Sequence, residues 1–298
     1  MMSTKNPNKH GEDGPELHGR RQALALGSLG IASAFLESGT AGLAAAAPGI
    51  EQAFESVDNR ITGLAKRVTV NGLTIEYEII GKGDPVVITP GGRFSKETPG
   101  VRELAEALAK GGKQVLIWDR PNCGGSDVSF DGESESALSA DTLAGLLRTL
   151  RMAPALVVGG SAGSRVSLLT AARHPNVVSK LFILWISGGP IGLAALAVVY
   201  CQGSANAANR GGMEAVAALP EWADSLKRNP ANRERILRHD PAKFIEGMQR
   251  WAANYFPLPG SPVPGMTVES FRSLRPWSCA VARAISVTPA RRARRCTR

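Results

Sequence analysis

A serine in a glycine-rich turn is the residue of this chain best placed to do chemistry. An apolar run at residues 155–158 leads into Gly-Gly-Ser-Ala-Gly at residues 159–163, and a helical pattern follows. This is the G-x-S-x-G arrangement of a nucleophile elbow, in which Gly159 and Gly163 let strand and helix approach closely. The Oγ of Ser161 would then stand clear of the sheet, beside the amides at the helix N-terminus. The pattern therefore predicts that Ser161 is a nucleophile.

A serine nucleophile also needs a proton acceptor, and the histidines are poorly placed for that role. His174 falls at the end of the helix that follows the turn, roughly 11 residues and about 16 Å from its start at 1.5 Å per residue. His239 is the last histidine of the chain, stands next to Asp240 and is expected at the surface. The histidine and acid that would complete a catalytic triad are therefore unassigned.

Strands that alternate with helices must position Ser161. Asn71 and Gly72, a strong hairpin signal, separate two predicted antiparallel strands at residues 67–70 and 73–80. Buried strands are predicted at residues 85–89, 114–118, 155–158 and 180–186, with helices at residues 101–110, 137–150 and 163–173. Such alternation predicts a parallel sheet covered on both faces, with its site at the carboxyl ends of the strands.

The pattern changes after residue 190 to helices without strands. Prolines and the Gly211-Gly212 pair interrupt these helices up to about residue 265, which predicts a helical cap over the strand ends. The cap contains Trp222, Phe244, Trp251, Tyr255 and Phe256. These aromatic residues could line an apolar substrate pocket, although packing between cap helices is the commoner role for such spacing.

Three segments together resemble the α/β-hydrolase family, over about residues 67–266. The first is the turn around Ser161. The second is Asp-Arg-Pro-Asn-Cys-Gly-Gly-Ser-Asp at residues 119–127, which is similar to the family's D-R-P-G-F-G-x-S-D loop except at Asn122 and Cys123. The third is Pro-Gly-Gly at residues 90–92, where the family usually has His-Gly-Gly. The resemblance implies an α/β fold with a doubly wound, mostly parallel sheet and a helical cap.

The resemblance also implies roles for particular residues. The backbone N–H groups of Gly92 and Ala162 would form the oxyanion hole that an acyl-transfer site needs. Asp119 and Arg120 would shape a turn and play a structural part. Serine rather than aspartate at the elbow argues against the dehalogenase and epoxide-hydrolase branches. Esterase, C–C bond hydrolase, peptidase and cofactor-free haloperoxidase chemistry all stay open, on a small apolar or ester-like substrate.

The end of the chain does not match the family. Members carry the triad in the order serine, acid, histidine, with the last two after late strands. Residues 272–298 contain eight arginines, no acidic residue, no histidine and no apolar run typical of a buried strand. We hypothesise that a frameshift near Leu274 replaced the last strands, acid and histidine, so little turnover is expected. A functional basic tail that binds an anionic partner is one alternative, and a non-catalytic small-molecule-binding protein of the same fold is another.

The net charge of the chain comes almost entirely from this tail. The 298 residues carry a formal charge of +9, from 35 basic and 26 acidic residues. Without residues 272–298, 27 basic residues face 26 acidic ones, which leaves +1. The composition therefore does not predict a basic face for nucleic acid.

The first 47 residues have the order of an export signal. Arg20 and Arg21 precede a mildly apolar stretch at residues 23–36 and then small residues up to Ala47. The paired arginines favour the twin-arginine route, which would carry the folded protein to the periplasm or the extracellular space. A membrane anchor is the alternative, but the apolar stretch of 14 residues at 23–36 is too short to span a bilayer, and no stable membrane span is expected elsewhere.

The predicted organisation is an export signal at 1–47, a core at 61–190, a cap at 191–265 and an aberrant basic tail at 266–298. The four cysteines have no metal-ligand spacing, and no cofactor motif is present, so neither a metal nor a cofactor is expected. Unpaired thiols are favoured over disulfides, and the sequence leaves the oligomeric state open.

Overall fold

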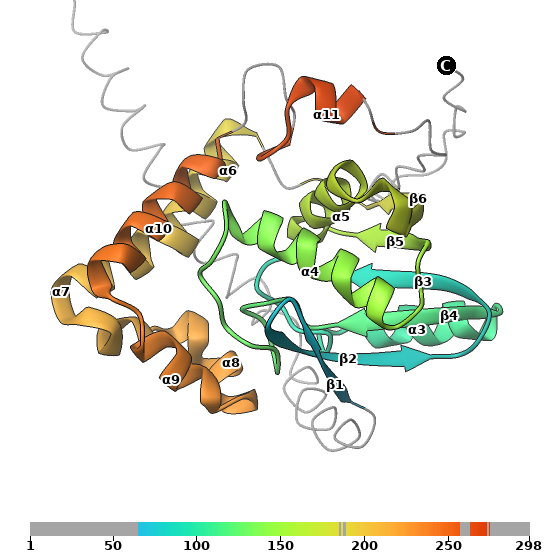
Figure 1. The fold of residues 1–298 in the computed structure, drawn as a ribbon, viewed down its shortest axis with the longest axis horizontal. Helices are drawn as coiled ribbons and strands as arrows, with labels where there is room; N and C mark the ends of the chain where they lie inside the picture. Colours follow the sequence, from blue (N-terminus) through green and yellow to red (C-terminus); the bar gives the residue numbers. More distant parts are fainter. Residues whose placement is uncertain (1–64, 185, 187–188, 257–262, 273, 275–298) are drawn as a thin grey trace, which may run out of the picture. The chain divides into compact units, whose positions relative to one another are not determined.

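The computed structural model describes residues 65–184, 186, 189–256, 263–272 and 274, which contain a six-stranded mixed sheet (Figure 1). Its order is β1-β2-β4-β3-β5-β6. The strands are β1 Lys66–Val70, β2 Leu73–Ile80, β3 Asp84–Thr89, β4 Lys113–Trp118, β5 Ala155–Gly159 and β6 Val178–Ile183. The predicted export signal and the tail beyond residue 274 lie outside the described residues.

The hairpin that opens the sheet is confirmed. β1 and β2 pair antiparallel from Lys66↔Tyr77 to Val70↔Leu73. Asn71 and Gly72 both have positive φ, 50° and 81°, which matches the turn type that suits twisted strands. β2 then pairs antiparallel with β4, whereas β4, β3, β5 and β6 run parallel.

Helices cover both faces of the sheet. Helix α3, Val101–Lys110, packs on Val86 and Ile88 of β3, while α4, Glu135–Thr149, and α5, Ala162–Arg173, pack on the opposite face, where Val87 points. Alternate residues of one strand face opposite sides, so this division confirms the two-sided parallel arrangement. The predicted starts and ends of these helices hold to within two residues.

The predicted bounds of β6 were wrong. The apolar run to residue 186 suggested a strand at 180–186, but the strand begins at Val178 and ends at Ile183. Its register with β5 ends at Gly159↔Ile183, where β5 turns into the helix, and Leu184 N–H makes the next bond, to Gly159 O at 2.9 Å. The partner strand, rather than the apolar run, sets the end of β6. In the described sheet β6 is an edge strand.

The described residues between 191 and 256 form helices and no strand, as predicted for the cap. They comprise α6 Pro190–Ala197, η2 Val198–Gln202, α7 Gly203–Ala217, η3 Pro220–Trp222, α8 Ala223–Arg228, α9 Ala231–Leu237 and α10 Pro241–Asn254, and a short α11, Val268–Arg272, follows. Their apolar residues form a cluster of their own around Phe130.

One part of the cap is more apolar than expected. By length and composition alone the run Ile191–Arg228 could cross a membrane, which the sequence reasoning did not anticipate. Helix α7 is broken at Gly211 and Gly212, and 39% of the most apolar window is buried inside the protein. In this structure the run folds as cap helices.

Candidate active site

Ser161 lies in the tight turn between β5 and α5. Its φ of 55° and ψ of −117° belong to a region that residues with a side chain rarely adopt. A Cβ added at Gly163 would overlap the carbonyl oxygen of Thr89, and one added at Gly159 would overlap the carbonyl oxygen of Gly163. Strand and helix therefore approach as closely as the predicted elbow requires, and only glycine fits at either position.

The loop after β3 packs directly against this serine. A Cβ added at Gly91 would lie 3.1 Å from Cβ and 3.7 Å from Oγ of Ser161. The carbonyl oxygen of Gly91 accepts hydrogen bonds from the N–H of Phe94 at 3.2 Å and from Nη2 of Arg120 at 3.1 Å. Because the peptide bond is planar and trans, the N–H of Gly92 points away from Arg120 and from the N–H of Phe94.

The contacts that Arg120 makes were not predicted from the sequence in detail. Its Nη2 also donates to the carbonyl oxygen of Gly92, so one guanidinium holds two successive carbonyls of this loop. A structural role was expected from its motif, but the two bonds join positions 28 and 29 residues apart. No local pattern reports a contact over that separation.

The second predicted oxyanion donor, Ala162, is the first residue of α5. Amides in the first turn of a helix have no carbonyl partner within the helix, and the helix dipole favours negative charge there. The structure thus brings Gly91 against Ser161, which directly precedes the first turn of α5.

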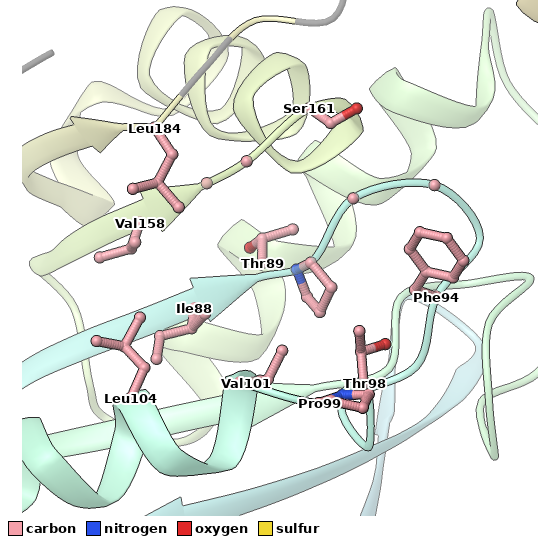
Figure 2. A pocket seen from close by; sticks show the side chains of 16 residues that line it. Ile88, Thr89, Phe94, Thr98, Pro99, Val101, Leu104, Val158, Ser161 and Leu184 are labelled. Atoms are coloured by element: carbon pink, nitrogen blue, oxygen red, sulfur yellow. The ribbon is translucent and has the colours of Figure 1, made fainter. Parts of the chain in front are cut away.

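A cavity of about 360 Å³ adjoins these residues (Figure 2). Ser161, Gly91 and Gly92 belong to its lining, and its apolar walls are Ile88, Phe94, Val101, Leu104, Val158 and Leu184. Figure 2 shows Leu184, Val158, Ile88 and Leu104 on one side and Phe94 on the other. Among the residues that the structure describes, no charged side chain lines the cavity.

Neither histidine of the described chain lies at this cavity. His174 ends α5, and its Nε2 lies 2.7 Å from Oδ1 of Asp141. His239 is half-buried, with its ring 5.1 Å from that of Phe130, and burial lowers the pKa of its imidazole. Within the described residues, Ser161 therefore has no imidazole partner.

Three of the predicted cap aromatics pack around Phe130, and none of the five lines the cavity. Trp222, Phe244 and Trp251 are buried around Phe130, at ring distances of 5.5, 4.7 and 6.2 Å. Tyr255 lies 5.4 Å from the guanidinium of Arg165. The packing role is thus the one that the structure assigns to the three buried rings.

Asp119, in the loop after β4, binds backbone N–H groups of two neighbouring segments. Oδ1 of Asp119 accepts the N–H of Lys96 at 2.6 Å, and Oδ2 accepts that of Gly125 at 2.9 Å. Burial raises the pKa of this carboxyl to about 6, although Lys96 opposes the shift. Asp119 therefore ties the segment before α3 to the turn after β4.

The two described cysteines are free and buried. Burial raises the pKa of Cys123 to about 11 and that of Cys201 to about 12, which keeps both thiols protonated and unreactive. Cys279 and Cys296 lie outside the described residues. Among the residues that the structure describes, no group of three His, Cys, Asp or Glu side chains could hold a metal ion.

Comparison with known proteins agrees with this architecture. The family model for the alpha/beta hydrolase fold matches residues 84–224. The chain is 36% identical over 124 residues to sn-1-specific diacylglycerol lipase ABHD11 of Mus musculus, covering 40% of this chain and 38% of the relative. It is 31% identical over 121 residues to a 2-hydroxy-6-oxononadienedioate/2-hydroxy-6-oxononatrienedioate hydrolase of Burkholderia vietnamiensis, covering 40% and 42%.

A third match is Serine hydrolase BPHL of Homo sapiens, 29% identical over 126 residues, covering 40% of this chain and 41% of the relative. The chain thus spans about two fifths of the length of each of these relatives. Sheet order, helices and matches together define the class: the chain has an α/β-hydrolase fold, and residues 84–224 match the model of that family. The named relatives are hydrolases.

Proposed function

We propose that this chain is a hydrolase-fold protein of the serine type. Ser161 would attack a substrate carbonyl, and the N–H groups of Gly92 and Ala162 would stabilise the oxyanion that forms. The observation that carries this proposal is the strained backbone of Ser161 between β5 and α5, beside Gly91, where an added Cβ would lie 3.1 Å from Cβ of Ser161. A structural turn has no need of a strained serine at that point.

The substrate we propose is small, uncharged at its acyl part and ester-like. Support comes from the cavity beside Ser161, whose described lining is largely apolar and includes no charged side chain. An ionised group would lose its hydration there without gaining a partner. The diacylglycerol lipase relative is named for an ester substrate of this kind, whereas the Burkholderia relative is named for a dioate.

We expect turnover by this chain to be very low. Removing the histidine of a serine triad lowers kcat by about a millionfold, because the serine hydroxyl is then a weak nucleophile. His174 and His239 have other partners, so neither supplies the missing base. Rapid ester cleavage by the purified chain that depends on Ser161 would contradict this expectation.

A fluorophosphonate probe tests the nucleophile itself. We expect slow labelling of the folded chain that is lost in Ser161→Ala and kept in Ser179→Ala, since Ser179 is exposed on β6 and distant from the turn. Intact mass after long incubation measures the labelled fraction. Absence of labelling in folded protein would instead favour the second candidate, a non-catalytic small-molecule-binding protein that retains the cavity.

We also propose that residues 1–47 direct export by the twin-arginine route. The paired Arg20-Arg21 before an apolar stretch supports this proposal. Expression with Arg20→Lys and Arg21→Lys, followed by fractionation, tests it, because these changes should leave the chain in the cytoplasm. An unchanged distribution would contradict it.

The proposed frameshift near Leu274 has a test of its own. The other reading frame downstream of Leu274 should encode apolar strand patterns together with an acid and a histidine. If it does not, the alternative of a functional basic tail gains support. That alternative predicts salt-sensitive anion binding that is lost on deletion beyond Leu274.

A further inference from the structure

Arg93 occupies a position between the loop after β3 and the cap. It directly follows Gly92, and its side chain is only 7% exposed. Nε donates to Oε1 of Glu135 at 2.9 Å, Nη1 to Oε1 of Glu221 at 3.4 Å and Nη2 to the carbonyl oxygen of Tyr200 at 3.3 Å. Glu135 begins α4 in the core, while Glu221 and Tyr200 belong to η3 and η2 of the cap.

Aromatic rings flank the same guanidinium. Its central carbon lies 4.9 Å from the ring centre of Tyr200 and 4.5 Å from that of Trp222, a residue that is fully buried. Burial would lower the pKa of Arg93, but Glu135 and Glu221 raise it above the usual value, so the side chain stays charged. Such buried, paired contacts are geometrically exacting.

We propose that Arg93 is a positioning residue that couples the placement of the cap to the direction of the Gly92 N–H. The proposal rests on the proposed oxyanion role of Gly92. Arg120 binds the carbonyls of Gly91 and Gly92 from the core side, and the cap binds the next residue, Arg93, through Glu221 and the carbonyl of Tyr200. A shift of η3 or η2 therefore acts on the peptide that carries the proposed oxyanion donor.

Arg93 acts through its neighbours and does not bind substrate. Its Nε, Nη1 and Nη2 each have a protein acceptor, and its side chain is absent from the cavity lining. Glu221 also accepts the hydroxyl of Ser204 at 2.6 Å, which anchors it to α7. These contacts of Arg93 and Glu221 thus form a joint between the cap and the loop after β3.

Glu221→Gln tests this coupling with little change in shape, because it weakens only the cap side of the joint. Arg93→Lys keeps the charge but loses the planar fork. Arg235→Gln is the matched control, since it removes another bond between cap and core, the ion pair of Arg235 with Asp127 at 2.6 Å, which does not touch the loop. Amide hydrogen exchange over residues 90–94, melting temperature and the rate of Ser161 phosphonylation are measured for each variant.

We expect Glu221→Gln and Arg93→Lys to speed exchange over residues 90–94 and slow phosphonylation, each about tenfold, below the 10²- to 10³-fold loss for a whole oxyanion donor. Arg235→Gln should lower the melting temperature and leave both rates unchanged. Unchanged exchange in the first two variants, or equal effects of Arg235→Gln, would overturn the coupling. Absence of phosphonylation in the unmodified chain would count against the proposed function alone, because the exchange data still decide the coupling.

Discussion

At the scale of single residues, close backbone approach governs the region around Ser161. Gly163 sits in a helix with ordinary backbone angles, yet an added Cβ would overlap the carbonyl oxygen of Thr89 and come within 2.7 Å of that of Pro90. These atoms belong to the end of β3 and the loop after it, and cannot rotate away as a side chain would. Glycine is needed at position 163 because no space is left for a side chain.

Gly163→Ala should therefore destabilise the fold by about 1–3 kcal/mol, the usual range for overpacking. Gly192→Ala is the matched helical control, because nothing lies within 4 Å of the Cβ that it would add. That change should stabilise slightly, by about 0.5–1 kcal/mol, since alanine favours helix. Urea unfolding measures both, and equal effects of the two changes would refute the steric argument.

At the scale of elements, a buried lysine joins β2 to the loop before α3. The side chain of Lys96 is 1% exposed, and its Nζ lies 2.9 Å from Glu76, 3.7 Å from Glu78 and 2.5 Å from Glu97. Arg67 and Arg102 complete the set by pairing with Glu76 and Glu78. The charges of strand and loop thus neutralise one another, with Lys96 and Glu78 buried and Arg67 and Arg102 partly exposed.

Lys96→Met should cost about 3–5 kcal/mol of stability, because it leaves buried carboxylates without their cation. Lys113→Met is the control, since Lys113 pairs with the exposed Asp84 and should matter little. Thermal or urea unfolding at neutral pH distinguishes the two. A small effect of Lys96→Met would mean that Arg67 and Arg102 suffice to hold the carboxylates.

Glu76 of this cluster and the nearby Asp119, which accepts the N–H of Lys96, predict a pH profile of stability. Burial would raise the pKa of Glu76, but Lys96 and Arg67 bring it below the usual 4.5, so its stabilising effect is lost as pH falls below that value. Asp119 acts in the opposite sense: its folded pKa of about 6 exceeds the unfolded value, so its protonation favours the fold as pH falls through 6. Urea unfolding from pH 7 to 3 should show a rise followed by a fall, and Asp119→Asn should remove the rise.

At the scale of the whole molecule, the two faces of the described sheet are unequally covered. Helices α4 and α5 pack on one face, whereas α3 packs on the other, where Leu104 is 38% exposed and β6 forms the edge. Ile186, just beyond β6, is 41% exposed. An edge strand with apolar neighbours is a template for pairing with another chain.

We therefore expect the purified chain to self-associate with increasing concentration. Ile186→Lys should reduce this association, because a lysine beside an edge opposes pairing. Val198→Lys is the control, since Val198 is more exposed, at 59%, but lies on the cap. Sedimentation velocity over a concentration series measures the effect, and an equal response to both changes would locate the association elsewhere.

Most elements of the core could be predicted because their signals are local. The hairpin at Asn71-Gly72, the helix Val101–Lys110 and the strand before Ser161 follow from turn residues and apolar period, which act over a few positions. The end of β6 could not, since it depends on where β5 stops. The same limit applies to Arg93, whose partner Glu221 is 128 positions away.

The order of residues alone determined the fold class and the serine turn, because glycine spacing and strand-helix alternation encode local geometry. Only the tertiary structure decided which groups surround that turn: the loop of Gly91 and Gly92, the guanidinium of Arg120 that orients it and the largely apolar cavity beside it. These contacts join segments that are distant along the chain. They exist only once the sheet has brought the ends of its parallel strands together.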